Sequence, residues 1–234
     1  MLGDRSSAKA TCWYIPTAPL RDGWSKRQAQ EQMASVGRQF NLQCAWIDVE
    51  YTKGAELKAA IGKLGKVDVI YAEMGNTYNL CYHLWNSGGA ELIKELMDAG
   101  ASMPTSCVIE RNPLSRDPMG LTAASNSFRA SFAVYVGASA GSIMAGRTCQ
   151  MALWKDWDDQ SCEGTVSVDW SDKEVAKGLN LAGGRSIFPH ANGQYADAKW
   201  QQAQAQRHGH TDHEVVALQD GHGIVIEGDA VKIL

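Results

Sequence analysis

The sequence lacks an uncharged apolar run of about 20 residues, the length that a membrane-spanning helix requires. Its first residues, MLGDRSSAKA, also lack the apolar core of a secretory signal peptide. The net charge is only −4 over 234 residues, which gives no electrostatic reason to expect nucleic acid or an anionic membrane surface as a partner. These absences favour a cytoplasmic protein that acts on a small molecule or a peptide.

Cysteine pairs with metal-binding or redox spacing are missing as well. The six cysteines show no CxxC spacing and lie mostly in apolar segments, as buried free thiols in a reducing compartment would. His208, His210 and His213 have an HxHxxH spacing, but their tract is polar and no acidic or thiol ligand set accompanies them. We therefore expect no metal and no cofactor.

Apolar runs and helical patterns alternate through the first part of the chain. Predicted strands cover residues 10–15, 45–49, 67–71 and 131–136, and predicted helices cover residues 25–40, 55–64 and 79–99. Such alternation predicts a single α/β domain over residues 1–234, with a doubly wound, mostly parallel sheet and helices on both faces.

Two regions depart from this alternation. Residues 101–130 contain three prolines and little apolar periodicity, so they are predicted to form a long connection. Short apolar runs follow at residues 186–188, 215–218, 224–227 and 231–234, with glycine-containing turns between the later ones. This spacing predicts a short antiparallel C-terminal extension at the edge of the sheet.

A serine stands where the strand at 131–136 gives way to a helical segment. The sequence VYVGASAGSIMAG places Gly137 and Gly141 on either side of Ser139. Such glycines allow a sharp turn that holds the serine in strained geometry, with its hydroxyl above the sheet edge. Small residues also occur where a strand simply packs closely on a helix. Ser139 is the predicted nucleophile.

An oxyanion formed at this serine needs backbone N–H donors. Ala140, at the start of the helix, is one candidate. Met74 and Gly75 follow the strand at 67–71, and loops at the carboxyl ends of parallel strands share one edge of the sheet. We expect the second donor there. Asn76 and Thr77 come next and are candidates for substrate binding, although capping of the following helix explains them equally well.

His190 is the predicted general base. It follows the apolar strand at 186–188 and Pro189, at the edge where a doubly wound sheet places its site residues. The orienting carboxylate is expected in the segment WKDWDDQ, which contains Asp156, Asp158 and Asp159 beside two tryptophans. An exposed acidic loop explains these aspartates almost as well.

These segments together resemble peptidase family S51, the group of dipeptidase E (alpha-aspartyl dipeptidase) and cyanophycinase. The resemblance rests, in chain order, on DVIYAEMGNTYNL, VYVGASAGSIMAG, ALWKDWDD, SIFPH and ALQDGHGIVIEGDAVKIL. It implies a fold like that of the class I glutamine amidotransferases and a triad of serine, histidine and acid. By resemblance Ser139 is the nucleophile, His190 the histidine and Asp158 the acid, with Asp159 as second choice.

The resemblance implies a serine peptidase that hydrolyses short peptides through an acyl-enzyme, with an N-terminal aspartate as one expected substrate feature. Recognition of that side chain would need a cation, for which Arg147, Lys155 and Arg185 are the candidates. The expected partner is a small peptide substrate, without nucleic acid or membrane, and the chain is expected to be a monomer or homodimer.

Family members usually carry two or three glycines before Asn-Thr, whereas this chain has Glu73, Met74 and Gly75. A second hypothesis is therefore a catalytically impaired binding or regulatory protein of the same fold. A third is an esterase or amidase that uses the same triad, because the turn itself does not specify the leaving group.

Overall fold

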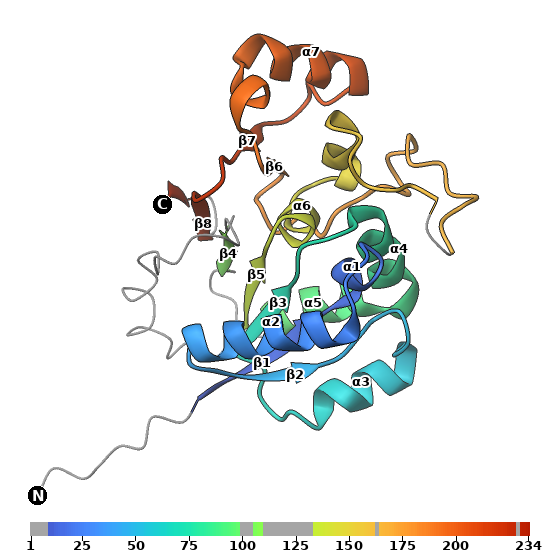
Figure 1. The fold of residues 1–234 in the computed structure, drawn as a ribbon, viewed down its shortest axis with the longest axis vertical. Coiled ribbons are helices and arrows are strands. Elements are labelled where there is room, and N and C mark those ends of the chain that lie inside the picture. Colours follow the sequence, from blue (N-terminus) through green and yellow to red (C-terminus); the bar gives the residue numbers. More distant parts are fainter. Residues whose placement is uncertain (1–8, 99–104, 110–132, 162–163, 228–229) are drawn as a thin grey trace, which may run out of the picture.

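A seven-stranded sheet forms the centre of the molecule in the computed structural model, which describes residues 9–98, 105–109, 133–161, 164–227 and 230–234 (Figure 1). The strand order is β2-β1-β3-β5-β4-β8-β9. The parallel strands are β1 (Ala10–Ile15), β2 (Leu42–Trp46), β3 (Val69–Ala72), β4 (Thr105–Ile109) and β5 (Val134–Gly137). The antiparallel strands at one edge are β8 (Gly223–Glu227) and β9 (Ala230–Ile233). The predicted fold, a mostly parallel sheet with an antiparallel C-terminal extension, is confirmed.

Helices lie on both faces of this sheet. They are α1 (Thr17–Leu20), α2 (Lys26–Gln39), α3 (Gly54–Gly62), α4 (Thr77–Ser87), α5 (Gly89–Asp98), α6 (Ala140–Ala145) and α7 (Ala198–His208), with short 3-10 turns η2 (Cys149–Trp154) and η3 (Gly193–Ala196). Along β1, Trp13 and Ile15 pack in the larger core with α3 to α6, whereas Cys12 and Tyr14 pack in a smaller core with α2. This alternation follows from the two-residue period of a strand.

A separate two-stranded sheet positions the C-terminal part of the site. Strand β6 (Ser186–Phe188) pairs in parallel with β7 (Val215–Ala217), and Phe188 lies opposite Ala217. Because the two strands run in the same direction, the residues that follow them leave the small sheet side by side. This brings the loop after Phe188 next to the loop after Ala217.

Two predicted elements differ from those observed. The helix predicted over residues 79–99 is two helices, α4 and α5, because Gly88 adopts a left-handed conformation (φ 78°) and ends α4. Strand β4 lies inside the segment predicted to be a long connection, and the other residues of 101–130 lie outside the described part of the chain. Within the described residues, no helix is long and apolar enough to span a membrane.

Candidate active site

The turn between β5 and α6 places Ser139 in a strained conformation. Its backbone has φ 46° and ψ −106°, a region that residues with a side chain rarely adopt. The flanking glycines are sterically required: a Cβ on Gly137 would lie 2.3 Å from the Gly141 carbonyl oxygen, and a Cβ on Gly141 would lie 2.1 Å from that of Ala72. The sharp turn therefore depends on both glycines.

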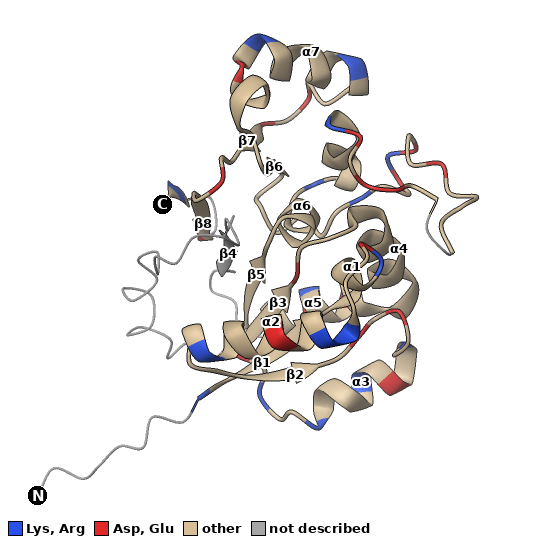
Figure 2. Ribbon diagram, in the orientation of Figure 1, with Lys and Arg blue, Asp and Glu red and all other residues tan. Residues whose placement is uncertain are grey.

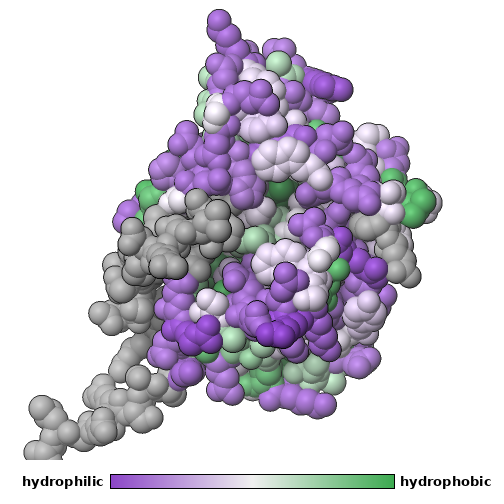
Figure 3. Space-filling model, in the orientation of Figure 1, coloured by the Kyte–Doolittle hydropathy of each residue, from purple (hydrophilic) through white to green (hydrophobic). Residues whose placement is uncertain are grey.

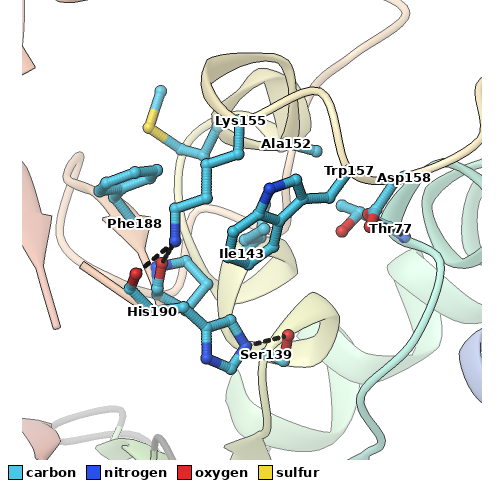
Figure 4. A pocket seen from close by; sticks show the side chains of 11 residues that line it. Thr77, Ser139, Ile143, Ala152, Lys155, Trp157, Asp158, Phe188 and His190 are labelled. Atoms are coloured by element: carbon cyan, nitrogen blue, oxygen red, sulfur yellow. Dashed lines mark hydrogen bonds between the residues drawn. The ribbon is translucent and has the colours of Figure 1, made fainter. Parts of the chain in front are cut away.

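Ser139, His190 and Asp220 form one hydrogen-bonded chain. Nε2 of His190 is 2.9 Å from Ser139 Oγ, and Nδ1 is 2.6 Å from Asp220 Oδ1. Because an ionised carboxylate can only accept, the proton lies on Nδ1, and Nε2 is left to accept from the serine hydroxyl. Figure 4 shows the imidazole of His190 turned toward Ser139. This is the geometry of a general base on a nucleophile.

Asp220 takes the position that the sequence predicted for Asp158, and that prediction is corrected. Asp158 Oδ2 instead accepts the backbone N–H of Thr77 at 2.7 Å, at the start of α4. Asp159 is exposed and accepts from the N–H and the hydroxyl of Ser161 at 2.8 and 2.7 Å. The missed residue is placed by β7, because Asp220 follows that strand as His190 follows β6.

The backbone of His190 is held by a lysine. His190 has a positive φ of 54°. The ammonium of Lys155 donates to the Pro189 carbonyl oxygen at 2.9 Å and to the carbonyl oxygen of His190 itself. It also lies over the rings of Trp157, Phe188 and Tyr195, at 4.2, 4.7 and 4.6 Å from their centroids. Lys155 therefore fixes the loop that carries the imidazole.

A small pocket opens at Ser139 and His190. Its volume is about 320 Å³, and its walls are mainly apolar. The residues that line it are Thr77, Ser139, Ile143, Met151, Ala152, Lys155, Trp157, Asp158, Phe188, Pro189 and His190. Figure 4 shows the Trp157 indole between the His190 side of the pocket and the Asp158–Thr77 side. Most of this volume is open to solvent, and the enclosed part, about 30 Å³, has room for a water molecule beside the nucleophile.

The loop after β3 contains the amides of Met74 and Gly75, both predicted to donate to an oxyanion, and one of the two is already hydrogen-bonded. The N–H of Met74 donates to Glu73 Oε1 at 3.0 Å, so this amide already has a partner. Glu73 is fully buried and also accepts from the Tyr14 hydroxyl at 2.5 Å. The Met74 side chain packs in the smaller core rather than lining the pocket. The prediction that Met74 is an oxyanion donor is therefore wrong, because the buried carboxylate of Glu73 accepts its N–H.

The oxyanion role of Gly75 and Ala140 stays a prediction, and the structure shows where the two residues lie. Gly75 has φ 129°, and a Cβ there would lie 2.5 Å from the Ala18 carbonyl carbon, so the loop needs a glycine. Ala140 is the first residue of α6, directly after Ser139. The two amides come from the carboxyl ends of the neighbouring strands β3 and β5.

The residues predicted to bind substrate are only partly at the pocket. Thr77 lines it. Asn76 caps α4 through Oδ1, which accepts from the Asn79 N–H at 2.8 Å, and its Nδ2 donates to the Asp159 carbonyl oxygen. The prediction for the two arginines is corrected: Arg147 pairs with Asp212 and Arg185 with Glu214, and neither lines the pocket. Those carboxylates neutralise both guanidinium groups away from Ser139.

A second Ser–His–Asp chain shows why hydrogen bonds alone do not define the site. Ser186 Oγ lies 2.8 Å from His213 Nε2, and His213 Nδ1 lies 2.7 Å from Asp212 Oδ1. Ser186, however, is fully buried within β6. Of these two serines, Ser139 is the one whose hydrogen-bond chain lies at a pocket and a strained turn. No group of three or more possible metal ligands occurs in the described part of the chain.

These features define an α/β protein with a serine, a histidine and an aspartate in one hydrogen-bonded chain beside a pocket. The model of peptidase family S51 matches residues 124–234, the part of the chain that contains Ser139, His190 and Asp220. The match agrees with the resemblance found in the motifs over this part of the chain, and it supports the expected class of enzyme, a serine-type peptidase. No curated protein matches the sequence.

Two solved structures are similar to this chain at low sequence identity. One, described as a "Putative Peptidase E Protein" from Listeria monocytogenes EGD-e, has a TM-score of 0.59 and 21% identity, covering 98% of this chain and 88% of that one. Another is described as a peptidase from an acI-B1 Actinobacterium, with a TM-score of 0.49, 13% identity and coverage of 98% and 75%.

Proposed function

We propose that this protein hydrolyses short peptides by acyl transfer through Ser139, His190 and Asp220. The observation that carries the proposal is the hydrogen-bonded chain from Ser139 Oγ through both imidazole nitrogens to Asp220 Oδ1, at 2.9 and 2.6 Å, beside an open pocket. The small volume of that pocket supports a short substrate.

His190 Nε2 takes the proton of Ser139 as the hydroxyl oxygen attacks the peptide carbonyl carbon. The amides of Ala140 and Gly75 are the proposed donors to the oxyanion that forms. His190 then returns the proton to the leaving amine, and water releases the acyl group by the same steps in reverse order. Asp220 fixes the imidazole tautomer and stabilises the imidazolium.

Dipeptides with an N-terminal aspartate are one of several groups of substrates that should be tested. The arginines expected to read an aspartate side chain are paired elsewhere. Lys155 lines the pocket, but its ammonium donates to two backbone carbonyls. The panel should therefore contain neutral as well as acidic N-terminal residues.

Ser139→Ala, Asp220→Asn and Asp158→Asn test the triad. Fluorophosphonate labelling and dipeptide hydrolysis should disappear in Ser139→Ala. Asp220→Asn should lower kcat by about a hundredfold or more, because the imidazole loses the partner that fixes its tautomer. On an ester without an α-amino group, Asp158→Asn should keep most of the wild-type rate. A larger loss in Asp158→Asn than in Asp220→Asn on that ester would restore Asp158 as the triad acid.

One observation favours the alternative of an impaired enzyme: the Met74 amide is engaged by Glu73 and is not available to an oxyanion. Comparing amide and ester turnover separates the possibilities. Turnover of esters alone would indicate an esterase, and absence of both labelling and turnover would indicate a binding protein.

A further inference from the structure

A buried carboxylate at the end of β3 belongs neither to the triad nor to the pocket wall. Glu73 directly follows this strand and is fully buried. Figure 2 shows the neighbouring strands β1, β3 and β5 without charged residues. Burying a carboxylate in such a place is costly unless donors compensate its charge. Its position at the start of the loop that leads to Gly75 therefore requires a reason.

Each oxygen of the Glu73 carboxylate accepts a hydrogen bond. The Tyr14 hydroxyl donates to Oε2 at 2.5 Å, and the Met74 N–H donates to Oε1 at 3.0 Å. The ionised carboxylate can accept both donors at once. Burial, followed by the charge of Glu73, raises the pKa of Tyr14, so its hydroxyl keeps its proton and stays a donor. The side chain of Glu73 is thus fixed between β1 and its own loop.

The stacking of two tyrosines orients the hydroxyl that holds Glu73. Tyr14 lies opposite Tyr71 in the parallel pair of β1 and β3. Their rings are stacked, with centroids 5.5 Å apart and an angle of 5° between the planes. The Glu73 N–H donates to the Ile15 carbonyl oxygen at 3.3 Å, so the strand pattern continues to this residue. Because side chains two residues apart share a face, Glu73 lies on the same side as Tyr71.

The loop after β3 is held on both sides of Gly75. The Met74 N–H is bound to Glu73, and the Asn76 N–H donates to the Ala18 carbonyl oxygen at 3.1 Å. Among the described residues, none accepts a hydrogen bond from the N–H of Gly75, which lies between these two. The loop therefore uses the amides before and after Gly75 as anchors and leaves the amide of Gly75 itself unused.

This loop also contacts the turn that carries the nucleophile. The Ala138 N–H donates to the Ala72 carbonyl oxygen at 3.0 Å, directly before the residue that begins the loop. Ala138 packs in the smaller core with Tyr14 and Met74, and it immediately precedes Ser139. The anchored loop and the turn of the nucleophile thus share a backbone hydrogen bond and a core.

We propose that Glu73 is a positioning residue for the reaction at Ser139. By holding the Met74 amide, its carboxylate keeps the N–H of Gly75 in place as a donor to the oxyanion that forms at the nucleophile. A donor that is already in place stabilises the oxyanion without rearranging during the reaction. This inference rests on the proposed function. In it, engagement of the Met74 amide by Glu73 prepares the site rather than impairing it.

Glu73→Ala removes the anchor of the Met74 amide. It should lower kcat on an ester and on a dipeptide by about 10- to 100-fold, because a loosened loop loses part of the contribution of one oxyanion donor. KM should stay nearly unchanged, since the oxyanion is absent from the bound substrate. Wild-type kcat in Glu73→Ala, or a raised KM with unchanged kcat, would overturn the inference.

Two milder variants test the same contact if Glu73→Ala does not fold. In Glu73→Gln the amide oxygen can still accept the Met74 N–H, and the amide nitrogen can donate to the Tyr14 hydroxyl oxygen. This variant should keep most of the wild-type kcat. Tyr14→Phe keeps the stacked ring but loses the donor to Glu73, and kcat should fall with KM unchanged. An equal loss of kcat in Glu73→Gln and Glu73→Ala would overturn the role of the anchor.

Asp48→Ala is the matched control for the loss of a buried carboxylate. Asp48 is buried shortly after β2, and its Oδ1 accepts from the Thr17 hydroxyl at 2.6 Å and from the Glu50 N–H at 3.1 Å. Like Glu73, it therefore binds one hydroxyl and one backbone amide. Asp48→Ala should lower the stability in urea but leave kcat of the folded protein unchanged. A fall in kcat equal to that of Glu73→Ala would show a general loosening of the fold and overturn the inference.

The rate of fluorophosphonate labelling separates this inference from the peptidase proposal, because labelling needs the nucleophile and the oxyanion donors but no peptide. Glu73→Ala should label at least about tenfold more slowly than wild type. If wild type labels and cleaves esters but no peptide, the peptidase proposal fails alone, and the labelling rates decide the role of Glu73. If wild type cleaves peptides and Glu73→Ala labels at the same rate, only the inference fails. A wild type without labelling or turnover overturns both.

Discussion

At the scale of single residues, the conformation of His190 requires an explanation. In a regular strand successive carbonyl groups point in opposite directions, yet those of Pro189 and His190 both accept from Lys155 Nζ. The left-handed φ of His190 accompanies this arrangement and carries a cost of about 1–3 kcal/mol. Lys155 stabilises that backbone and thereby positions the imidazole.

Lys155→Met should therefore lower kcat while leaving the KM of a small substrate nearly unchanged. Methionine keeps most of the apolar stem among the aromatic rings but loses the charged donor. We expect a decrease of about 10- to 100-fold, consistent with the loss of charge-assisted hydrogen bonds worth about 1.5–3 kcal/mol. Steady-state kinetics with a thermal melt as a folding check measure this.

Lys155→Arg is the conservative variant, since its guanidinium can still donate to both carbonyls and stack on the rings. Partial rescue by arginine, but not by methionine, would assign the effect to the carbonyl contacts. If methionine instead raises KM with unchanged kcat, Lys155 binds substrate and does not position His190.

Residue types and local motifs were enough to identify Ser139 and His190 as candidates, because each directly follows an apolar strand. They were not enough for Asp220. The sequence contains several aspartates near apolar segments, and the tryptophan-flanked group of Asp158 was the more distinctive. What selects Asp220 is the parallel pairing of β6 with β7, a contact between segments about 30 residues apart.

At the scale of elements, the approach of β3, β5 and α6 depends on the absence of side chains at two positions. Gly141 lies against the carbonyl group of Ala72 at the end of β3, and Gly137 against Gly141 itself. Because these neighbours are backbone atoms, no rotamer change can make room for a methyl group. The sharp turn and the strand–helix packing are consequently one structural unit.

Gly141→Ala should destabilise the protein by about 3 kcal/mol or more and abolish labelling of Ser139. A Cβ 2.1 Å from the Ala72 carbonyl oxygen forces α6 away from β3. Urea unfolding and fluorophosphonate labelling measure the two effects.

Gly62→Ala is the control, because nothing lies within 4 Å of a Cβ at that helical position. It should be neutral or slightly stabilising, since alanine favours the helix. A stable, fully labelled Gly141→Ala protein would show that the turn tolerates expansion, and would remove the steric argument for the glycine.

Strands and helices with regular apolar periodicity could be predicted from the sequence. The alternating parallel strands and their helices follow from apolar periodicity, and their order along the chain is as expected. Strand β4 was missed because its five residues stand in a proline-containing segment with little periodicity. Its pairing with β5 and β8 defines it, and that information is not local.

At the scale of the whole molecule, hydrophilic residues predominate on the face in Figure 3, with apolar residues in smaller groups between them. Figure 2 likewise shows basic and acidic residues interspersed on the helices. This agrees with the small net charge of −4. Buried polar contacts also join parts of the fold, and one such network lies at His210.

His210 connects three segments that are distant in the sequence. Its Nδ1 accepts from the Trp154 indole N–H at 3.1 Å, and its Nε2 donates to Gln150 Oε1 at 2.8 Å. Gln150 Nε2 in turn donates to the carbonyl oxygens of Trp170 and Ser171. Both imidazole nitrogens are therefore satisfied only in the neutral form, because a proton on Nδ1 would face another donor.

Stability should consequently fall as the pH is lowered from about 6.5 to 4. Burial, followed by the charges of His213, His208 and Lys173, lowers the pKa of His210 to about 4, and Asp212 opposes this only in part. In the unfolded chain the imidazole binds its proton near pH 6.5. Between these values the unfolded state holds more protons, so acid favours unfolding, by roughly 3 kcal/mol at most.

Urea unfolding of wild type and His210→Gln at pH 7, 6 and 5 tests this contribution. The variant should be less stable than wild type at pH 7, because it loses the two-sided hydrogen bonding, but it should lose less stability on acidification. His222→Gln is the matched control, since His222 is exposed and should leave the pH dependence as in wild type. If His210→Gln and wild type lose equal stability between pH 7 and 5, other groups account for the acid sensitivity and the His210 network is only a packing contact.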